Sequence, residues 1–225
     1  MSAVGTGGNS QRSKAARERV LQAALRALAA NGYRGSSLAS IAAGAGLTTA
    51  GLLHHFPSKN DLLVSVLTER DRQDGARFHL REVKGLAALD RLQELVAHNA
   101  RNPELVRAFT VLLGESVGEG HPARRWAQER YPRRRASLAA ALRAGVDSGE
   151  IRTGVDAEAV AAQIIAMMDG LQVQWVLNPE HVDMSALFAL YLDGVRRGIT
   201  AEARAEPARR EPAADPSSPS SESTG

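Results

Sequence analysis

Several residue types are missing or scarce in this chain of 225 residues. It contains no cysteine, which excludes disulfides, thiolate metal sites and cysteine nucleophiles and suits a reducing cytoplasm. Aromatic residues make up only 4%, and no stretch alternates with a period of two, so β-sheets are disfavoured. No apolar run approaches the ~20 residues that cross a bilayer, and the first residues lack the apolar core of a signal peptide. These absences predict an all-α cytoplasmic protein without a membrane segment.

Catalytic and metal-binding patterns are also missing. The chain has no His-Glu-x-x-His, no glycine-rich phosphate loop after a strand and no serine placed as a nucleophile elbow. The adjacent pair His54-His55 points in directions about 100° apart on a helix, so the two rings cannot chelate one ion as residues four apart do. We therefore expect no enzymatic activity, no cofactor and no metal site.

Charge is distributed unevenly along the chain. Residues 1–60 hold seven basic side chains against the single acidic Glu18, a net charge of +6. Because the whole chain carries +3, the remainder carries −3. A basic first segment on a slightly acidic body is typical of a nucleic-acid binder, and the alternative is a solvated basic helix face.

Apolar spacing and glycine or proline breaks divide the chain into about nine helices between two polar ends. We expect a disordered arm over 1–12, a small helical domain over 13–73, a larger helical domain over 74–200 and a disordered tail over 201–225. The predicted helices cover residues 14–30, 38–45, 48–55, 59–82, 86–101, 103–117, 121–148, 156–177 and 183–199.

The segment from Gly32 to Lys59 has the pattern of a helix-turn-helix. Ala42 supplies a small residue where two helices approach closely, and four positions later Gly46 can adopt the positive φ of the turn. Ser36 or Ser37 can cap the first of these helices. Apolar residues fill the interior between the helices: Ile41, Ala45, Leu47, Leu52 and Phe56. The alternative is an ordinary helical hairpin within a larger bundle.

The same segment resembles the TetR family of bacterial transcription regulators. The matching residues are Gly32-Tyr33, Ser36-Ser37-Leu38, Ile41-Ala42, Ala45-Gly46-Leu47 and His54-His55-Phe56-Pro57-Ser58-Lys59. The resemblance implies a homodimeric regulator, expected to be a repressor, that leaves a palindromic double-stranded DNA operator when a small-molecule effector binds. The competing interpretation is a helical adaptor that binds protein and not DNA.

The resemblance also implies a DNA-binding site. Phosphate contacts are expected from Ser37, His55 and Lys59, and base contacts from Thr48, Thr49, Ala50, Gly51, Leu53 and His54. Leu53 stands where the family usually has tyrosine, and the second helix of the motif has no Arg, Asn or Gln. Contacts to thymine methyl groups, with His54 as the main polar reader, are therefore expected.

In the larger domain, the resemblance implies a homodimer through the last two helices, although these could instead close the monomer core. It also implies an effector pocket, for which the candidate lining residues are His98, Phe109, Trp126, Tyr131, Met167, Met168 and Trp175. Each of these side chains could equally be plain core. The segment 169–175 resembles the branch with choline-responsive BetI-type repressors, but two tryptophans and three tyrosines offer weak support for an aromatic cage.

A run of arginines lies in the middle of the larger domain. It comprises Arg124, Arg125, Arg130, Arg133, Arg134 and Arg135. We expect a solvated helix surface there, with an anionic effector or a second nucleic-acid contact as the alternative.

Overall fold

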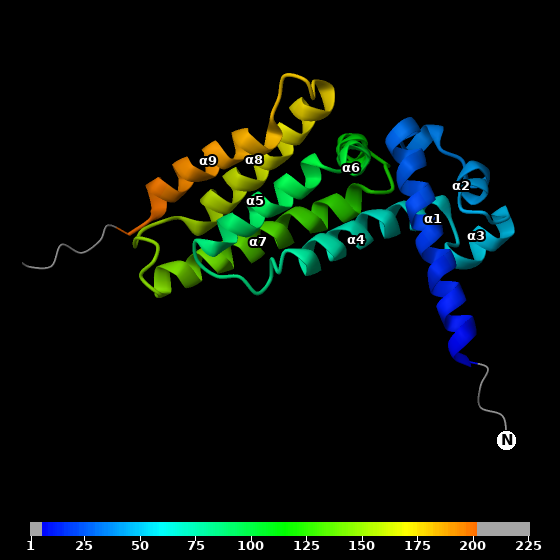
Figure 1. Cartoon of the computed structure of the whole chain (residues 1–225), viewed down its shortest axis with the longest axis horizontal. Helices are drawn as coiled ribbons and strands as arrows, with labels where there is room; N and C mark the ends of the chain where they lie inside the picture. Colours follow the sequence, from blue (N-terminus) through cyan, green and yellow to red (C-terminus); the bar gives the residue numbers. More distant parts are fainter. Residues whose placement is uncertain (1–5, 202–225) are drawn as a thin grey trace, which may run out of the picture.

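The computed structural model describes residues 6–201, which form nine helices and an isolated bridge between Ile151 and Thr200 (Figure 1). The predicted all-α fold is confirmed. The helices are α1 (Thr6–Gly35), α2 (Leu38–Gly44), α3 (Thr49–His55), α4 (Lys59–Arg77), α5 (Ala87–Ala100), α6 (Pro103–Ser116), α7 (Arg124–Asp147), α8 (Ala157–Leu177) and α9 (Met184–Ile199).

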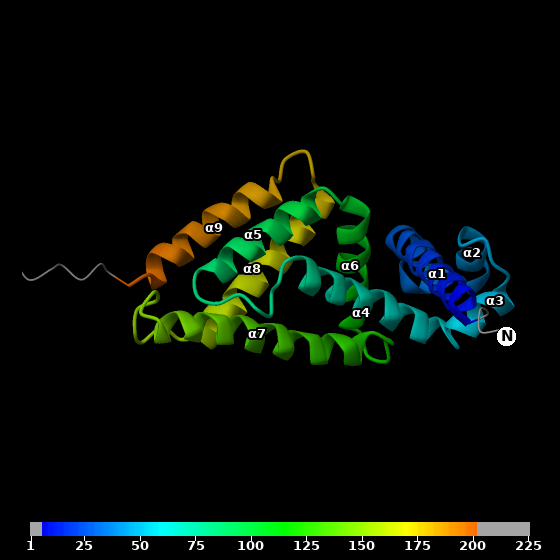
Figure 2. The same ribbon diagram turned by 60° about the horizontal axis from the view of Figure 1, so that its bottom comes forward.

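The helices form a small head and a larger body. The head consists of α1, α2 and α3, and α4 runs from it into the body beside α7 (Figure 2). One hydrophobic cluster, the head core, is built mainly from α1 to α4 but also takes in Phe109 and Leu112 of α6 and Trp126 of α7. A second cluster, the body core, joins α5, α7, α8 and α9. Head and body therefore share α6 and α7 as packing surface instead of meeting at a simple boundary.

The first helix is longer at both ends than the sequence predicted. It begins at Thr6, so residues 6–12 of the predicted disordered arm are helical, while residues 1–5 lie outside the described range. Once a helix is nucleated, each added residue gains a hydrogen bond, so weak helix formers can extend it. Beyond the predicted end at residue 30 the chain kinks at Gly32, with φ 65°, and the helix continues to Gly35. Of the predicted disordered tail, residues 202–225 lie outside the described range.

The fourth helix ends at Arg77 and not at the predicted residue 82. Phe78 turns into the body core, and His79 adopts φ 49°, which breaks the helical path. Residues 78–86 then form turns, and two hydrogen bonds from backbone N–H groups fix the last residues of this segment to the body. The Gly85 backbone N–H donates to the Ala141 carbonyl at 2.8 Å, and the Leu86 N–H donates to the Glu150 carboxylate at 2.9 Å.

The last two helices expose much of the apolar surface of the body. Seven large hydrophobic side chains are exposed among the described residues, and five of them lie on α8 and α9: Met167, Val173, Leu177, Leu187 and Leu190. We call these five the α8–α9 patch. Within the described range, α8 alone is long and apolar enough to cross a membrane by length and composition, with a mean hydropathy of 1.3. It packs against α6, α7 and α9, as a core helix does.

Candidate DNA-binding site and ligand cavity

The turn between α2 and α3 depends on Gly46, which has φ 69°. This left-handed conformation lets the Leu47 N–H donate to the Ala42 carbonyl at 2.9 Å and the Gly46 N–H to the Ala43 carbonyl at 3.0 Å. Ala42 and Leu52 are buried on either side of the turn. The small residue and the glycine thus hold the two helices in the angle of a helix-turn-helix.

Three hydroxyl side chains cap the N-termini of α2, α3 and α4. Ser37 accepts from the Ser40 N–H at 3.0 Å, Thr48 from the Gly51 N–H at 3.1 Å and Ser58 from the Asp61 N–H at 3.1 Å. Of the two predicted caps for α2, Ser37 is therefore the cap. Ser36 instead is buried and donates to the Gly32 carbonyl at 2.8 Å. Ser37 and Thr48 are exposed, so an anion can approach the backbone N–H groups in the first turns of α2 and α3.

The inner side of α3 fixes which side chains face outward. Leu52 and the adjoining Phe56 lie in the head core. Arg17 of α1 lies over the Phe56 ring, with its guanidinium carbon 5.0 Å from the ring centre. Arg19 donates to the Ala45 carbonyl at 3.3 Å. These two arginines brace the motif from α1, a role that the sequence did not single out.

The structure leaves the predicted DNA-binding residues accessible. Ser37, Thr48, Thr49, Ala50, Leu53 and His54 are exposed, whereas Gly51, His55 and Lys59 are half-buried. Lys59 lies over the Tyr33 ring, with its ammonium nitrogen 4.3 Å from the ring centre, and the Tyr33 hydroxyl donates to Asn60. The lysine is thereby positioned at the start of α4, beside α3. No cluster of three metal-ligating side chains occurs in the described part of the chain.

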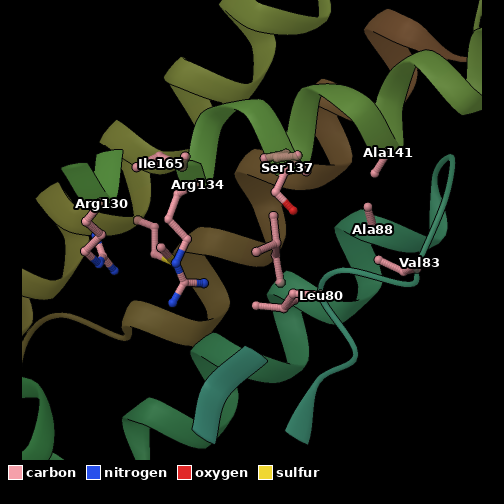
Figure 3. Close-up of a pocket in the computed structure, with 11 residues that line it drawn as sticks. Leu80, Val83, Ala88, Arg130, Arg134, Ser137, Ala141 and Ile165 are labelled. Atoms are coloured by element: carbon pink, nitrogen blue, oxygen red, sulfur yellow. The ribbon is translucent and has the colours of Figure 1, made fainter. Parts of the chain in front are cut away.

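The body contains an apolar cavity of about 50 Å³ between α5, α7, α8 and the 78–86 segment (Figure 3). Eight of its lining residues are apolar, and the other three, Arg130, Arg134 and Ser137, come from α7. The apolar lining residues are Leu80, Val83, Ala88, Leu92, Leu138, Ala141, Ile165 and Met168.

Of the seven residues predicted to line a pocket, Met168 alone lines this cavity. The other six lie elsewhere, because the aromatic side chains fill cores. Phe109 and Trp126 belong to the head core, and Trp175 packs against the body core. Met167 is 38% exposed in the α8–α9 patch. His98 lies against the Phe78 ring, and Tyr131 donates to the Asp169 carboxylate at 2.6 Å.

At one side of the cavity lies a cluster of charged side chains, buried or half-buried, that the sequence did not predict. Arg130 Nε lies 3.1 Å and 3.2 Å from the two carboxylate oxygens of Asp71, and Arg134 Nη2 donates to the same carboxylate at 2.8 Å. Only 7% of the Arg130 side chain is exposed, so the expectation of a solvated arginine surface is wrong at this position. Arg133 and Arg135 are exposed, as expected. The partner of Arg130 lies 59 residues away, so no local pattern identifies it.

Burial shifts the ionisation of this cluster. It lowers the pKa of Arg70 to about 10, although the nearby Asp74 carboxylate opposes the shift. Burial also raises the pKa of Asp74 and Asp169. For Asp71 burial acts in the same direction, but the charges of Arg130 and Arg134 outweigh it and lower the pKa. Asp71 is thus the carboxylate that the arginines hold most firmly in its ionised form.

A helix-turn-helix head with an exposed second helix, joined to a helical body with a cavity, defines a transcription regulator of the ligand-responsive class. Two family models match the chain: "Bacterial regulatory proteins, tetR family" over residues 20–66 and "BetI-type transcriptional repressor, C-terminal" over residues 87–209. The chain belongs to the TetR family of DNA-binding transcriptional regulators.

Individual relatives agree with this assignment. The chain is 26% identical over 184 residues to the fatty acid metabolism regulator protein of Bacillus subtilis, covering 80% of this chain and 93% of that protein. The structure of FadR from Bacillus subtilis in complex with stearoyl-CoA superimposes with a TM-score of 0.69 at 24% identity, covering 81% of this chain and 98% of that one. A regulator from Saccharomonospora viridis in complex with choline gives 0.68 at 25% identity, covering 83% and 98%. These relatives are regulators and not enzymes.

Proposed function

We propose that this regulator is a cytoplasmic homodimeric repressor that binds a palindromic operator through α3 and releases it when a small molecule enters the body. The observation that carries the proposal is the exposed outer face of α3 on a basic head, with its inner face fixed by Leu52 and Phe56. The same surface argues against a helical adaptor, because a protein partner would not require the concentration of positive charge in the first 60 residues.

The phosphate contacts come from residues at the ends of the helices around α3. Ser37 presents the N-terminus of α2, and His55 and Lys59 lie at the end of α3 and the start of α4. Thr48, Thr49, Ala50, Gly51, Leu53 and His54 face the base edges in the major groove. Because few of these side chains donate hydrogen bonds, contacts to thymine methyl groups and DNA shape contribute much of the specificity.

The dimer forms through the α8–α9 patch. An exposed apolar group of this kind is typical of an interface, and a second copy would bury it in a four-helix arrangement. Two heads would then address successive major grooves about 34–36 Å apart, which doubles the number of contacts made by each short α3.

The effector occupies the cavity between α5, α7 and α8. Its lining contains no aromatic side chain, so it has no cage for a quaternary amine such as the choline seen in the regulator from Saccharomonospora viridis. Its apolar walls instead suit a molecule with a long apolar part. The stearoyl-CoA in the complex of the Bacillus subtilis regulator also has a long apolar chain.

The test is to select genomic DNA fragments bound by the purified protein and to compare the wild type with the double variant His55→Ala/Lys59→Ala by fluorescence anisotropy. We expect the variant to remain folded and to lose specific binding. Unchanged affinity together with an unchanged dependence on salt would contradict the proposed site, and failure to retain any DNA at low salt would favour the adaptor.

A further inference from the structure

The polar residues of the cavity lie at one side of it and on one helix. Arg130, Arg134 and Ser137 follow one another at spacings of four and three residues, so they form a stripe along α7 (Figure 3). The rest of the lining is apolar and comes from α5, α7, α8 and the 78–86 segment. The cavity therefore has a cationic edge and an apolar interior, which is the complement of an amphipathic anion.

Arg130 at this edge, and Arg70 behind it, have guanidinium donors without a hydrogen-bond partner among the described residues. Arg130 Nη1 is buried and finds no hydrogen-bond partner among the described residues, and the same holds for Nε and Nη1 of the neighbouring Arg70. Arg130 is held in place by the rings of Phe109 and Trp126, whose centres lie 4.7 Å and 5.5 Å from its guanidinium carbon. A buried donor without an acceptor costs free energy, so an incoming anion would be favoured here.

The charges around the cavity favour an anion over a cation. No carboxylate lines it. Of the three carboxylates nearby, Asp71 is paired with Arg130 and Arg134, Asp74 lies 3.6 Å from Arg70, and Asp169 accepts from Tyr131. The cationic group of a ligand would lie against the guanidinium groups at the polar edge of the cavity and would be repelled.

An anionic group of a ligand would compete with the Asp71 carboxylate for Arg130 and Arg134. This carboxylate binds both arginines together, and Asp71 belongs to α4, the helix whose first residue is Lys59 of the DNA-binding site. We propose that Arg130 and Arg134 form an anion site, and that an effector with an anionic head and an apolar chain displaces Asp71 from it. Displacement would release α4 from α7 and so alter the placement of the head. This inference rests on the proposed function, since it names the effector class and the contact through which the effector acts.

The apolar chain needs more room than the cavity of about 50 Å³ provides, because ligand pockets measure roughly 300–1,000 Å³. The wall that can yield is the 78–86 segment, which contributes Leu80 and Val83 (Figure 3). It is not helical, and His79 within it has φ 49°, a conformation that is unfavourable for a residue with a side chain. An entering chain would displace these side chains and not the helices.

The test uses the full chain and three probes: dodecanoate, dodecanoyl-coenzyme A and dodecyltrimethylammonium, all below micelle formation. Binding is measured by calorimetry without DNA, and release is measured by anisotropy with a selected genomic fragment. We expect one or both anionic probes to bind and to release DNA, and the cationic probe with the same chain to do neither. The two anionic arms distinguish a carboxylate from the phosphates of coenzyme A as the head. Equal binding of the cationic probe, or no binding of either anion, would overturn the proposal.

Two variants test the site itself. Arg134→Gln should weaken binding of the anionic probe by about tenfold or more, the value of one charge-assisted hydrogen bond. Arg133→Gln and Arg135→Gln, exposed neighbours on the same helix, should leave it unchanged. Asp71→Asn should strengthen probe binding and weaken DNA binding without any probe. An unchanged affinity in Arg134→Gln, or weaker probe binding in a folded Asp71→Asn, would overturn the proposal, and the arginine series decides alone if Asp71→Asn does not fold.

Failure of the two proposals can be separated. If the wild type retains no genomic DNA, the proposed function fails. Calorimetry without DNA still measures whether the anionic probes bind at Arg130 and Arg134. If the wild type retains DNA but neither binds the anionic probes nor releases DNA with them, the inference about the anion site fails. The proposed function as a DNA-binding regulator is then unaffected.

Discussion

The Glu115 carboxylate at the end of α6 accepts a hydrogen bond from the Tyr33 backbone N–H at 2.9 Å. This N–H is free because the chain leaves the helical path at Gly32, where φ is 65°. The carboxylate also fills the space beside Gly32, since a Cβ there would lie 2.6 Å from Glu115 Oε1. His121 Nε2 lies 3.8 Å from the same carboxylate, and its ring packs edge-on against Tyr33. One side chain of the body therefore closes the kink of the first head helix.

Glu115→Ala should loosen this joint. The Tyr33 N–H would lose its acceptor, and we expect a loss of about 1 kcal/mol in the free energy of unfolding, the usual value of one hydrogen bond. Urea denaturation measures the change. Glu119→Ala removes an exposed carboxylate four residues along and should leave stability unchanged. If both variants unfold at the same urea concentration as the wild type, the joint does not stabilise the protein.

Lys59→Ala should weaken DNA binding nearly uniformly across operator sequences, since a phosphate contact carries no base information. The slope of log affinity against log salt should fall by about 0.9, the value for one phosphate contact. Anisotropy titrations over a salt series measure it. Lys84→Ala, an exposed lysine of the body, should leave the slope unaltered. Equal slopes for Lys59→Ala and the wild type would remove Lys59 from the interface.

Tyr131→Phe should destabilise the fold in a way that depends on pH. Burial raises the pKa of Asp169 above its usual 3.8, and the hydrogen bond from Tyr131 partly opposes this rise. Without the hydroxyl, the ionised Asp169 stays buried with one donor fewer, at a cost of about 2 kcal/mol near pH 7. The cost should shrink as the pH falls through the raised pKa, because the protonated carboxyl tolerates burial.

Urea midpoints between pH 7.5 and pH 4 measure this difference. Tyr191→Phe is the matched control, because no hydrogen bond is assigned to its hydroxyl in the described part of the chain, and it should show a small effect without this trend. A cost for Tyr131→Phe that grows as the pH falls would contradict the role given to Asp169.

Leu190→Arg should convert the dimer into monomers. Leu190 is 66% exposed at the centre of α9, where a buried unpaired charge in the α8–α9 patch would be costly. Light scattering after size exclusion measures the mass. Val117→Arg adds the same charge at a residue that is 75% exposed outside the patch, and it should remain dimeric. A dimeric Leu190→Arg would place the interface elsewhere.

Gly145→Ala should destabilise the body. A Cβ at this position would lie 2.8 Å from the Gly85 Cα and 2.7 Å from Ile151 Cδ1, and backbone cannot move aside as a flexible side chain can. Overpacking of this kind costs about 1–3 kcal/mol. Gly75→Ala, in α4 with open space around it, should instead gain up to about 1 kcal/mol from helix propensity. Thermal denaturation compares the two variants, and a stable Gly145→Ala would mean that α5 and α7 can separate.

The sequence predicted the helices well wherever local chemistry defines their ends. The predicted helix over 103–117 is α6 over Pro103–Ser116, and that over 156–177 is α8, which begins after the Asp156 cap. The helix-turn-helix was equally accessible, because Gly46 and the capping hydroxyls act within a few residues. The predicted end of the fourth helix was wrong because Phe78 is buried by partners distant in sequence.

The cavity could not be predicted for the same reason. Large aromatic side chains maximise buried area and fill cores, so the cavity is bounded by Leu, Ile, Val, Ala and Met instead. Arg130 lies in an arginine-rich helix, and its burial depends on partners distant in sequence, Asp71 and the ring of Phe109. A spacing of four residues between Arg130 and Arg134 was the one local sign of a shared partner.

Because α4 is one continuous helix, a tilt at the Asp71 contact would move its first residue, Lys59. Twelve residues separate Lys59 from Asp71, a distance of about 18 Å at 1.5 Å per residue. A tilt of roughly 10° about Asp71 would swing the start of α4 by about 3 Å, close to the 3.4 Å step between base pairs. In a twofold dimer both heads move, so their separation can change by nearly two steps. If an effector displaces Asp71 as proposed, a small tilt of α4 at this contact would therefore be enlarged at the start of the helix.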